Sequence, residues 1–238
     1  MTTLERAPAR SRPEDALRQE LLERLAHDLR SPLSAVSTAS LLLREHRLTG
    51  PQRSQQLRLI DAACHRMSRV MEDMLDLARI DAGAFPLRFA AVSTTSLFEG
   101  LDRDVGWLAR EAGVQLVPML AGEPMRHVWV DHRQTARALH AVVQHAIQRT
   151  HAGGTVQVRS AERGRGFGVD VVHEGRTLGS AEREHLFDWS WSLPPTERSR
   201  AGHPSLALAR RILALQGGFI EAVNQKTGPA FQISLPSA

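Results

Sequence analysis

The sequence predicts a helical hairpin followed by an α/β layer domain. Residues 15–47 and 52–82 carry apolar side chains at alternating steps of three and four, which is the spacing of long helices that bury one stripe. After residue 83, short runs of alternating polar and apolar residues are separated by helical segments, an order typical of α/β folds. We therefore expect three regions: a flexible tail over residues 1–14, the hairpin over 15–83 and the α/β domain over 84–238.

The composition limits the class of protein. The 238 residues include 42% hydrophobic and 24% charged residues, an ordinary balance for a globular protein. No stretch reaches the roughly 20 apolar residues of a membrane span, and the first residues lack the apolar core of a signal peptide. We therefore expect a cytoplasmic protein without membrane insertion. The formal net charge is +4, but arginines alternate with acidic residues along the predicted helices, so we expect no nucleic-acid binding.

The two predicted hairpin helices each carry one apolar stripe. The first stripe consists of Leu22, Leu25, Leu29, Leu33, Val36, Ala39 and Leu43, and the second of Leu57, Ile60, Cys64, Met67, Met71, Met74 and Ala78. Thr49-Gly50-Pro51 should separate the helices, and Gly83 should cap the second. Cys64 is the single cysteine, and its place in the stripe predicts a small buried hydrophobic side chain. Because two such helices cannot bury both stripes alone, we expect an antiparallel hairpin that forms a homodimeric four-helix bundle.

The α/β region is predicted element by element. Ser96–Glu99 has the sequence of a capping box and predicts a helix from 96 to 113. Further helices are expected over 133–149 and 205–215, and strands over 114–117, 128–130, 155–161, 166–173, 219–223 and 230–235. Gly164 to Gly168 reads Gly-x-Gly-x-Gly. Because this segment connects two strands, we interpret it as a hairpin turn and not as a nucleotide loop.

The segment around His27 is the strongest candidate for chemistry. On the seven-residue repeat, His27 falls on the outer face of the first helix, where a neutral imidazole is accessible as a nucleophile toward phosphorus. Asp28 is adjacent and can hydrogen-bond the ring, and Ser31 lies one turn further on. Pro32 inside a long helix costs about 3 kcal/mol. His27 could be an ordinary surface histidine, one of eleven histidines in the chain. A proline tolerated so close to it at this cost favours a functional role for the segment instead.

In combination, four motifs of this chain resemble the sensor histidine kinases of two-component systems. His27 to Leu33 is similar to the H-box on the first helix of the dimerising hairpin. The remaining three motifs are Leu77-Ala78-Arg79-Ile80-Asp81-Ala82-Gly83, Val128–Asp131 with the later Gly153-Gly154-Thr155-Val156, and Leu206–Ile212 with Gly217-Gly218. The resemblance covers nearly the whole chain and implies an α/β sandwich of the histidine kinase ATPase type after the hairpin.

The resemblance also implies roles for the residues near His27. His27 would take up a phosphoryl group and exchange it with an aspartate in the receiver domain of a response regulator. Asp28 and Ser31 would assist proton transfer and position the hydrolytic water in the reverse direction. Because nothing before Asp15 resembles a sensor domain, we expect the input to come from elsewhere, for example from a separate sensor kinase.

The boxes that bind ATP and magnesium in this family are degraded here. The position of the metal-binding Asn is His145, and the earlier Asn of that box is Ala141. The adenine-reading Asp is His173; Gly175 remains, but Thr177 replaces the second glycine. In the last glycine-rich loop one glycine survives, Gly202, and the following Pro204 has no N–H to offer a phosphate. These changes predict that no ATP or magnesium is bound, and we expect no other cofactor.

Two further groups of residues have structural interpretations. His140, His145, His173 and His203 suggest a metal site, but His140 and His145 are five apart and do not share a helix face. We therefore expect no metal and interpret these histidines as replacements in a vestigial pocket. Trp189 and Trp191, near Leu186-Phe187, are expected to pack the domain.

Three functions remain open from the sequence. The preferred hypothesis is a histidine phosphotransferase derived from a kinase, with the α/β domain as a scaffold or docking surface. One alternative is an ATP-dependent histidine kinase with divergent nucleotide boxes, controlled by a sensor on a separate chain. The other is a non-catalytic partner that binds receivers or kinases through the hairpin. Nucleotide binding by the purified protein distinguishes best among them.

Overall fold

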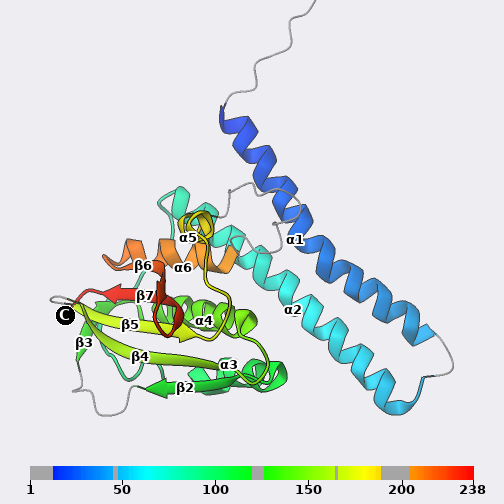
Figure 1. The fold of residues 1–238 in the computed structure, drawn as a ribbon. Helices are drawn as coiled ribbons and strands as arrows, with labels where there is room; N and C mark the ends of the chain where they lie inside the picture. The colour runs from blue at the N-terminus through cyan, green and yellow to red at the C-terminus, as the bar shows by residue number, and fades with distance from the viewer. Residues whose placement is uncertain (1–12, 45–47, 120–125, 164–165, 189–203) are drawn as a thin grey trace, which may run out of the picture. The chain divides into compact units, whose positions relative to one another are not determined.

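The computed structural model describes residues 13–44, 48–119, 126–163, 166–188 and 204–238 (Figure 1). The expected tail over residues 1–14 therefore lies almost entirely outside the described residues. The chain divides into two compact units, which meet between Glu72 and Asp73. The first unit contains helix α1 and most of helix α2, and the second contains the last turns of α2 and all following elements.

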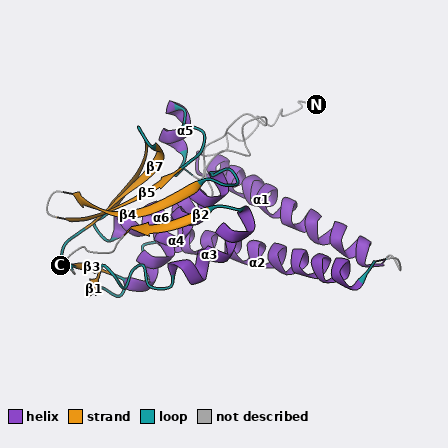
Figure 2. Ribbon diagram, turned by 60° about the horizontal axis from the view of Figure 1, so that its bottom comes forward, coloured by secondary structure: helices purple, strands orange, loops and turns teal. Residues whose placement is uncertain are grey.

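The hairpin consists of α1 (Pro13–Arg44) and α2 (Gly50–Asp81), which run antiparallel in both ribbon views (Figures 1 and 2). The turn before α2 forms a reciprocal cap. The Gln52 side chain accepts a hydrogen bond from the Thr49 backbone N–H at 2.9 Å, and the Thr49 hydroxyl accepts one from the Gln52 N–H at 3.4 Å. Gly50 and Pro51 therefore begin α2 instead of separating the helices, because this capping box satisfies the first free N–H groups.

The buried face of α2 matches the predicted apolar stripe only in part. On α2, Ala63 and Val70 are buried and Ile60 and Met67 are half-buried, so these residues form the face that packs in the hairpin. Cys64 is exposed, and the prediction that its side chain is buried is wrong for the single chain. The reason is periodic: positions seven apart that include Cys64 lie about 100° around the helix from Ala63 and Val70, so they form a second, exposed row.

The end of α2 follows the prediction. Gly83 has a φ of 66°, and the backbone N–H of Ala84 donates to the carbonyl of Arg79 at 2.8 Å. This is the left-handed glycine cap that closes many helices. The structure thus confirms Gly83 as the residue that terminates the helix.

The second unit contains a five-stranded sheet with the order β2-β4-β5-β7-β6 and a separate two-stranded sheet of β1 and β3. Its strands are β1 (Ala90–Ser93), β2 (Gln115–Met119), β3 (His127–Val130), β4 (Thr155–Arg163), β5 (Gly166–His173), β6 (Phe219–Gln225) and β7 (Gly228–Leu235). β2 and β4 are parallel, and every other pair of neighbours is antiparallel. Arg163 lies opposite Gly166, so the glycine-rich segment connects two paired strands, as predicted; its residues 164 and 165 lie outside the described part.

The helices of this unit are α3 (Leu101–Ala112), α4 (His132–Arg149), α5 (Ser180–His185) and α6 (Pro204–Leu215). α3, α4 and α6 cover one face of the five-stranded sheet (Figure 2). The core is formed by the apolar face of α4 and by β5, in which residues 167–173 are all buried. β1 and α5 were not predicted, because each is too short to show a clear period.

The predicted helix from 96 to 113 begins too early. Residues 94–100 form turns, and α3 starts only at Leu101, after Gly100 with a φ of 85°. The Ser96 hydroxyl donates backward to the Ser93 carbonyl at 2.8 Å, so it does not cap the N–H of Glu99. The sequence of a capping box is present, but the tertiary structure uses its serine in the preceding turn.

Among the residues that the structure describes, no helix combines the length and the apolar composition needed to cross a membrane.

Candidate functional site

The candidate phosphoacceptor segment lies in the middle of α1. The helix contains His27, Asp28, Ser31 and Pro32 and continues without a break past the proline. Pro32 is buried, Asp28 is half-buried and Ser31 is exposed. The His27 side chain lies outside the described part, so its predicted place on the outer face stays a prediction.

His145 and His173, which the sequence predicts to stand in degraded nucleotide boxes, come together in the second unit. His145 lies on α4 and His173 ends β5, and both rings contact Phe231 on β7. The His173 ring is stacked on Phe231 with centroids 6.0 Å apart, and the His145 ring meets it edge-on at 5.7 Å. Phe187, just after α5, meets Phe231 edge-on at 6.2 Å. We call His145, His173, Phe187 and Phe231 the aromatic cluster.

The aromatic cluster is packed as a hydrophobic core. Phe231 is 0% exposed, His173 1% and Phe187 5%. Edge-to-face and offset-stacked rings at these separations stabilise a core beyond the area that they bury. Sequence reasoning identified both histidines through the resemblance but missed Phe231 and Phe187 as their partners. The alternating pattern of β7 places Phe231 on the inner face, but nothing in the sequence shows which rings it meets there.

His173 is held in its neutral form. Burial, and secondly the positive charge of Arg149, lower its pKa from 6.5 to about 4. Neither ring nitrogen has a hydrogen-bond partner among the described residues. Burying the N–H and the acceptor nitrogen of the neutral ring without hydrogen bonds costs free energy, and the stacking on Phe231 is the contact that the ring makes in return.

The loop after β5 is tied to the end of α4. Gly175 pairs with Thr150, and a Cβ on Gly175 would lie 2.6 Å from the Arg149 carbonyl oxygen. Only glycine allows this close approach. Beside it, Glu182 accepts from Arg149 at 2.7 Å and from Arg176 at 2.8 Å, so the loop is held over the side of the aromatic cluster that His173 occupies. Gly202, the other surviving glycine, lies outside the described residues.

The three candidate histidines that the structure describes, His140, His145 and His173, do not converge on a metal site. His140 faces Asp104 on α3 at 3.6 Å, away from the aromatic cluster, and burial lowers its pKa although Asp104 acts in the opposite direction. Within the described ranges, no group of three or more His, Cys, Asp or Glu side chains is arranged to hold a metal ion. His203, Trp189 and Trp191 lie outside those ranges.

Comparison with known proteins explains the hairpin. Residues 17–83 match the family model of the His Kinase A (phospho-acceptor) domain. The chain is similar in sequence to sensor histidine kinases. It is 29% identical over 225 residues to the sensor histidine kinase MtrB of Mycobacterium tuberculosis, which covers 92% of this chain and 39% of MtrB. It is 26% identical to the sensor protein DivL of Caulobacter vibrioides, covering 93% of this chain and 28% of DivL. The chain thus spans about two fifths or less of the length of these relatives.

Solved structures confirm the predicted fold class. Histidine kinase AdeS of Acinetobacter baumannii superposes with a TM-score of 0.65 at 18% identity, covering 89% of this chain and 98% of AdeS. Histidine kinase ThkA, solved in complex with the response regulator protein TrrA, superposes with a TM-score of 0.67 at 20% identity, covering 94% of this chain and 63% of that chain. A helical hairpin followed by an α/β domain is therefore the fold of this chain as well as of these kinases.

The lowered pKa of His173 predicts a specific pH dependence of stability. In the unfolded chain the ring binds a proton below about pH 6.5, but in the folded protein only below about pH 4. Unfolding is therefore favoured progressively as the pH falls from 6.5 to 4, by about 3 kcal/mol in total. We expect His173→Phe to remove this component in urea unfolding curves recorded across that range. His132→Gln, at an exposed histidine, is the control, and an equal response of both variants would contradict the prediction.

Proposed function

We propose that this chain is a two-component phosphorelay protein whose His27 exchanges a phosphoryl group with an aspartate of a response-regulator receiver domain, without binding ATP. The observation that carries the proposal is the aromatic cluster, which fills the position of the degraded nucleotide boxes while the phosphoacceptor domain is intact. The matched domain includes His27, and a related fold, ThkA, is solved with a response regulator.

The chemistry at His27 requires only groups on the helix and the receiver. The unprotonated imidazole nitrogen forms a bond to phosphorus as the bond to the aspartate oxygen breaks, and the aspartate leaves as a carboxylate. The receiver's own metal ion neutralises the charge on the transferring group. Asp28, next to His27, is the candidate acceptor of the proton that the ring then carries, and Ser31 is positioned one turn away.

The loss of ATP binding follows from what the pocket positions now contain. A purine base needs a slot of its own size and an acceptor for its amino group, but the His173 ring is buried and stacked on Phe231. Magnesium prefers hard oxygen ligands, whereas His145 packs edge-on against Phe231. The kinase alternative requires these rings to separate at the expense of their core packing. The alternative of a non-catalytic binding partner has the same fold but involves no phosphoryl transfer at His27.

A homodimer through the hairpin is the second part of the proposal. Leu57, Cys64 and Met71 are seven residues apart on α2 and all are exposed in the single chain. A row of apolar residues with heptad spacing is buried in helical bundles by another helix. We propose that a second copy of the chain covers this row.

Nucleotide binding gives the first test. Loss of metal, base and phosphate contacts, at about 1–3 kcal/mol each, should leave a Kd for ATP in the millimolar range or weaker. Isothermal titration calorimetry with ATP and magnesium measures this, with an active histidine kinase as the positive control. A Kd in the low micromolar range would reject the ATP-independent mechanism and favour the kinase alternative.

Transfer from a phosphorylated receiver gives the second test. Radiolabelled phosphoryl should move from the receiver to this protein without ATP, as an acid-labile and base-stable phosphoramidate. His27→Gln should abolish labelling, and Asp28→Ala should slow it by about tenfold or more. His65→Gln changes an exposed histidine on α2 and should leave transfer unchanged. Labelling that requires ATP and no receiver indicates a kinase, and absence of labelling from any receiver or nucleotide indicates a binding-only partner.

The dimer gives the third test. Met71, 54% exposed, would be covered by the second copy, so Met71→Glu would bury an unpaired charge at a cost of several kcal/mol. Light scattering at micromolar concentration should show a dimer for the wild type and a monomer for this variant. Gln55→Glu adds the same charge at an exposed position outside the row and should stay dimeric. A wild type that is monomeric even at high concentration would exclude the homodimer.

A further inference from the structure

The last turns of α2 are held by buried charges. The second compact unit begins at Asp73, and the side chains of Asp73 and Asp76 lie one helical turn apart on the same face of α2. Both are buried, with 5% and 9% of their surface exposed. Buried carboxylates are costly unless they are paired and hydrogen-bonded, so their partners identify what this end of the helix is built to contact.

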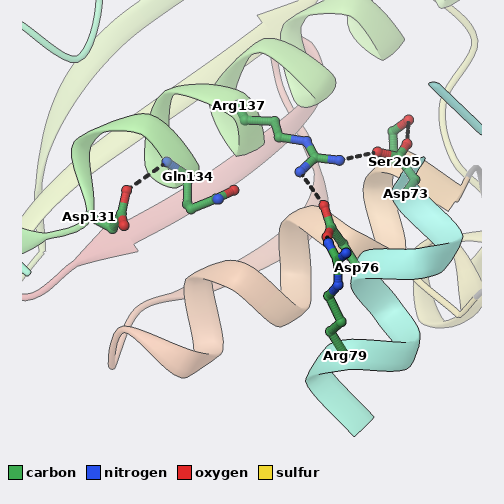
Figure 3. A network of polar contacts seen from close by, with 7 residues as sticks. All are labelled: Asp73, Asp76, Arg79, Asp131, Gln134, Arg137 and Ser205. Atoms are coloured by element: carbon green, nitrogen blue, oxygen red, sulfur yellow. Dashed lines mark hydrogen bonds and ion pairs between the residues drawn. The ribbon is translucent and has the colours of Figure 1, made fainter. Parts of the chain in front are cut away.

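Arg137 on α4 is the shared partner of both carboxylates (Figure 3). One terminal nitrogen of its guanidinium donates to Asp73 at 2.7 Å and the other donates to Asp76 at 2.6 Å. Burial acts to lower the pKa of Arg137, but the hydrogen bonds and charges of Asp76 and Asp73 outweigh it and raise the pKa. The planar fork of an arginine can serve two carboxylates at once, which a lysine cannot do with the same geometry.

Further contacts tie the same segment to neighbouring helices. The Ser205 hydroxyl, in the first turn of α6, donates to the second oxygen of Asp73. Asp76 also pairs with Arg79 at 2.9 Å, but Arg79 is largely exposed. Arg211 on α6 pairs with Asp81 at 2.9 Å, and both of these side chains are exposed by more than half. The less exposed part of the network is therefore formed by the buried Asp73 and Asp76 with the half-buried Arg137 and Ser205.

The loop that follows α2 is also attached to α4, through a contact near the end of the loop. The backbone N–H of Arg88 donates to the Asp131 carboxylate at 2.7 Å. The other oxygen of Asp131 accepts from the N–H of Gln134 at 3.0 Å and caps α4 (Figure 3). The loop over residues 82–89 thus lies between two attachments to α4, one through Arg137 and one through Asp131.

We propose that Arg137 is a latch that joins residues 73–81 of α2 to the α/β domain as one rigid body, so that any hinge between hairpin and α/β domain lies before Asp73. The loop after Gly83, where the helix ends, is then not the hinge. The physical basis is that releasing Arg137 removes the shared partner of two buried carboxylates. Asp73 would keep only the Ser205 hydroxyl of the contacts described above, and Asp76 only the largely exposed Arg79. The proposal does not depend on whether the chain transfers phosphate.

Hydrogen exchange of the full-length protein, followed by mass spectrometry, tests the latch. In Arg137→Gln, amides of residues 73–81 should exchange about tenfold or more faster than in the wild type, while those of β4 and β5 keep their rates. Arg211→Gln is the matched control, because it removes an arginine that pairs with the same segment at an exposed site. It should change exchange over residues 73–81 by less than about twofold.

A second variant separates the latch from a general loss of stability. Asp76→Asn should accelerate exchange over residues 73–81 less than Arg137→Gln does, and it should add almost nothing in the Arg137→Gln background, because the two residues act as one unit. If Arg137→Gln does not fold, Asp76→Asn alone must still show the local acceleration. Exchange in Arg137→Gln that equals that of Arg211→Gln, or that rises equally throughout the α/β domain, would overturn the proposal.

Discussion

Phe231 lies at the point where α4, β5, β7 and the segment after α5 meet, and the rings of His145, His173 and Phe187 contact it. The packing around Phe231 joins the sheet to its helical layer, because it uses one side chain from each element. Two of the four rings stand where related kinases are expected to hold metal and adenine. The same positions therefore support the core of the domain here, and a change that opened them for a ligand would also weaken the packing.

His173 is a residue that packs in the core at a position where related kinases are expected to bind a ligand. A carboxylate at that position would need polar partners or solvent, since a buried unpaired charge is very costly. A neutral imidazole with a pKa of about 4 can be buried at neutral pH, and it stacks on Phe231. The tight pairing of Gly175 with Thr150 and the ion pairs of Glu182 then hold the following loop beside it. The phosphoryl exchange without nucleotide that we propose rests on this closed core together with the match of residues 17–83 to the phospho-acceptor domain.

Helix α4 organises the rest of the second unit. Asp131 caps its start and holds the loop from α2, Arg137 binds two buried carboxylates of α2, and His145 enters the aromatic cluster. These three contacts are spaced along one helix, so its position fixes the end of α2 and the aromatic core together. This explains why the last turns of α2 group with the α/β domain although they continue the hairpin helix.

The sequence by itself determined the element order apart from β1 and α5, and it indicated the candidate nucleophile, because helical and strand periods and the segment around His27 are local patterns. It placed β5 at residues 166–173 and the helix cap at Gly83 as the structure has them, and the resemblance singled out His145 and His173. Only the tertiary structure decided which local signals are used: Thr49 and Gln52 form a capping box, whereas Ser96, with the same signature, bonds backward to Ser93. It also decided that Cys64 is exposed in the single chain, that Phe231 is the centre of the aromatic cluster, and that Arg137 meets Asp73 across 64 residues. The physical reason is that periodicity reports which residues avoid water, but a partner distant in the chain is selected by packing and charge after the elements have come together.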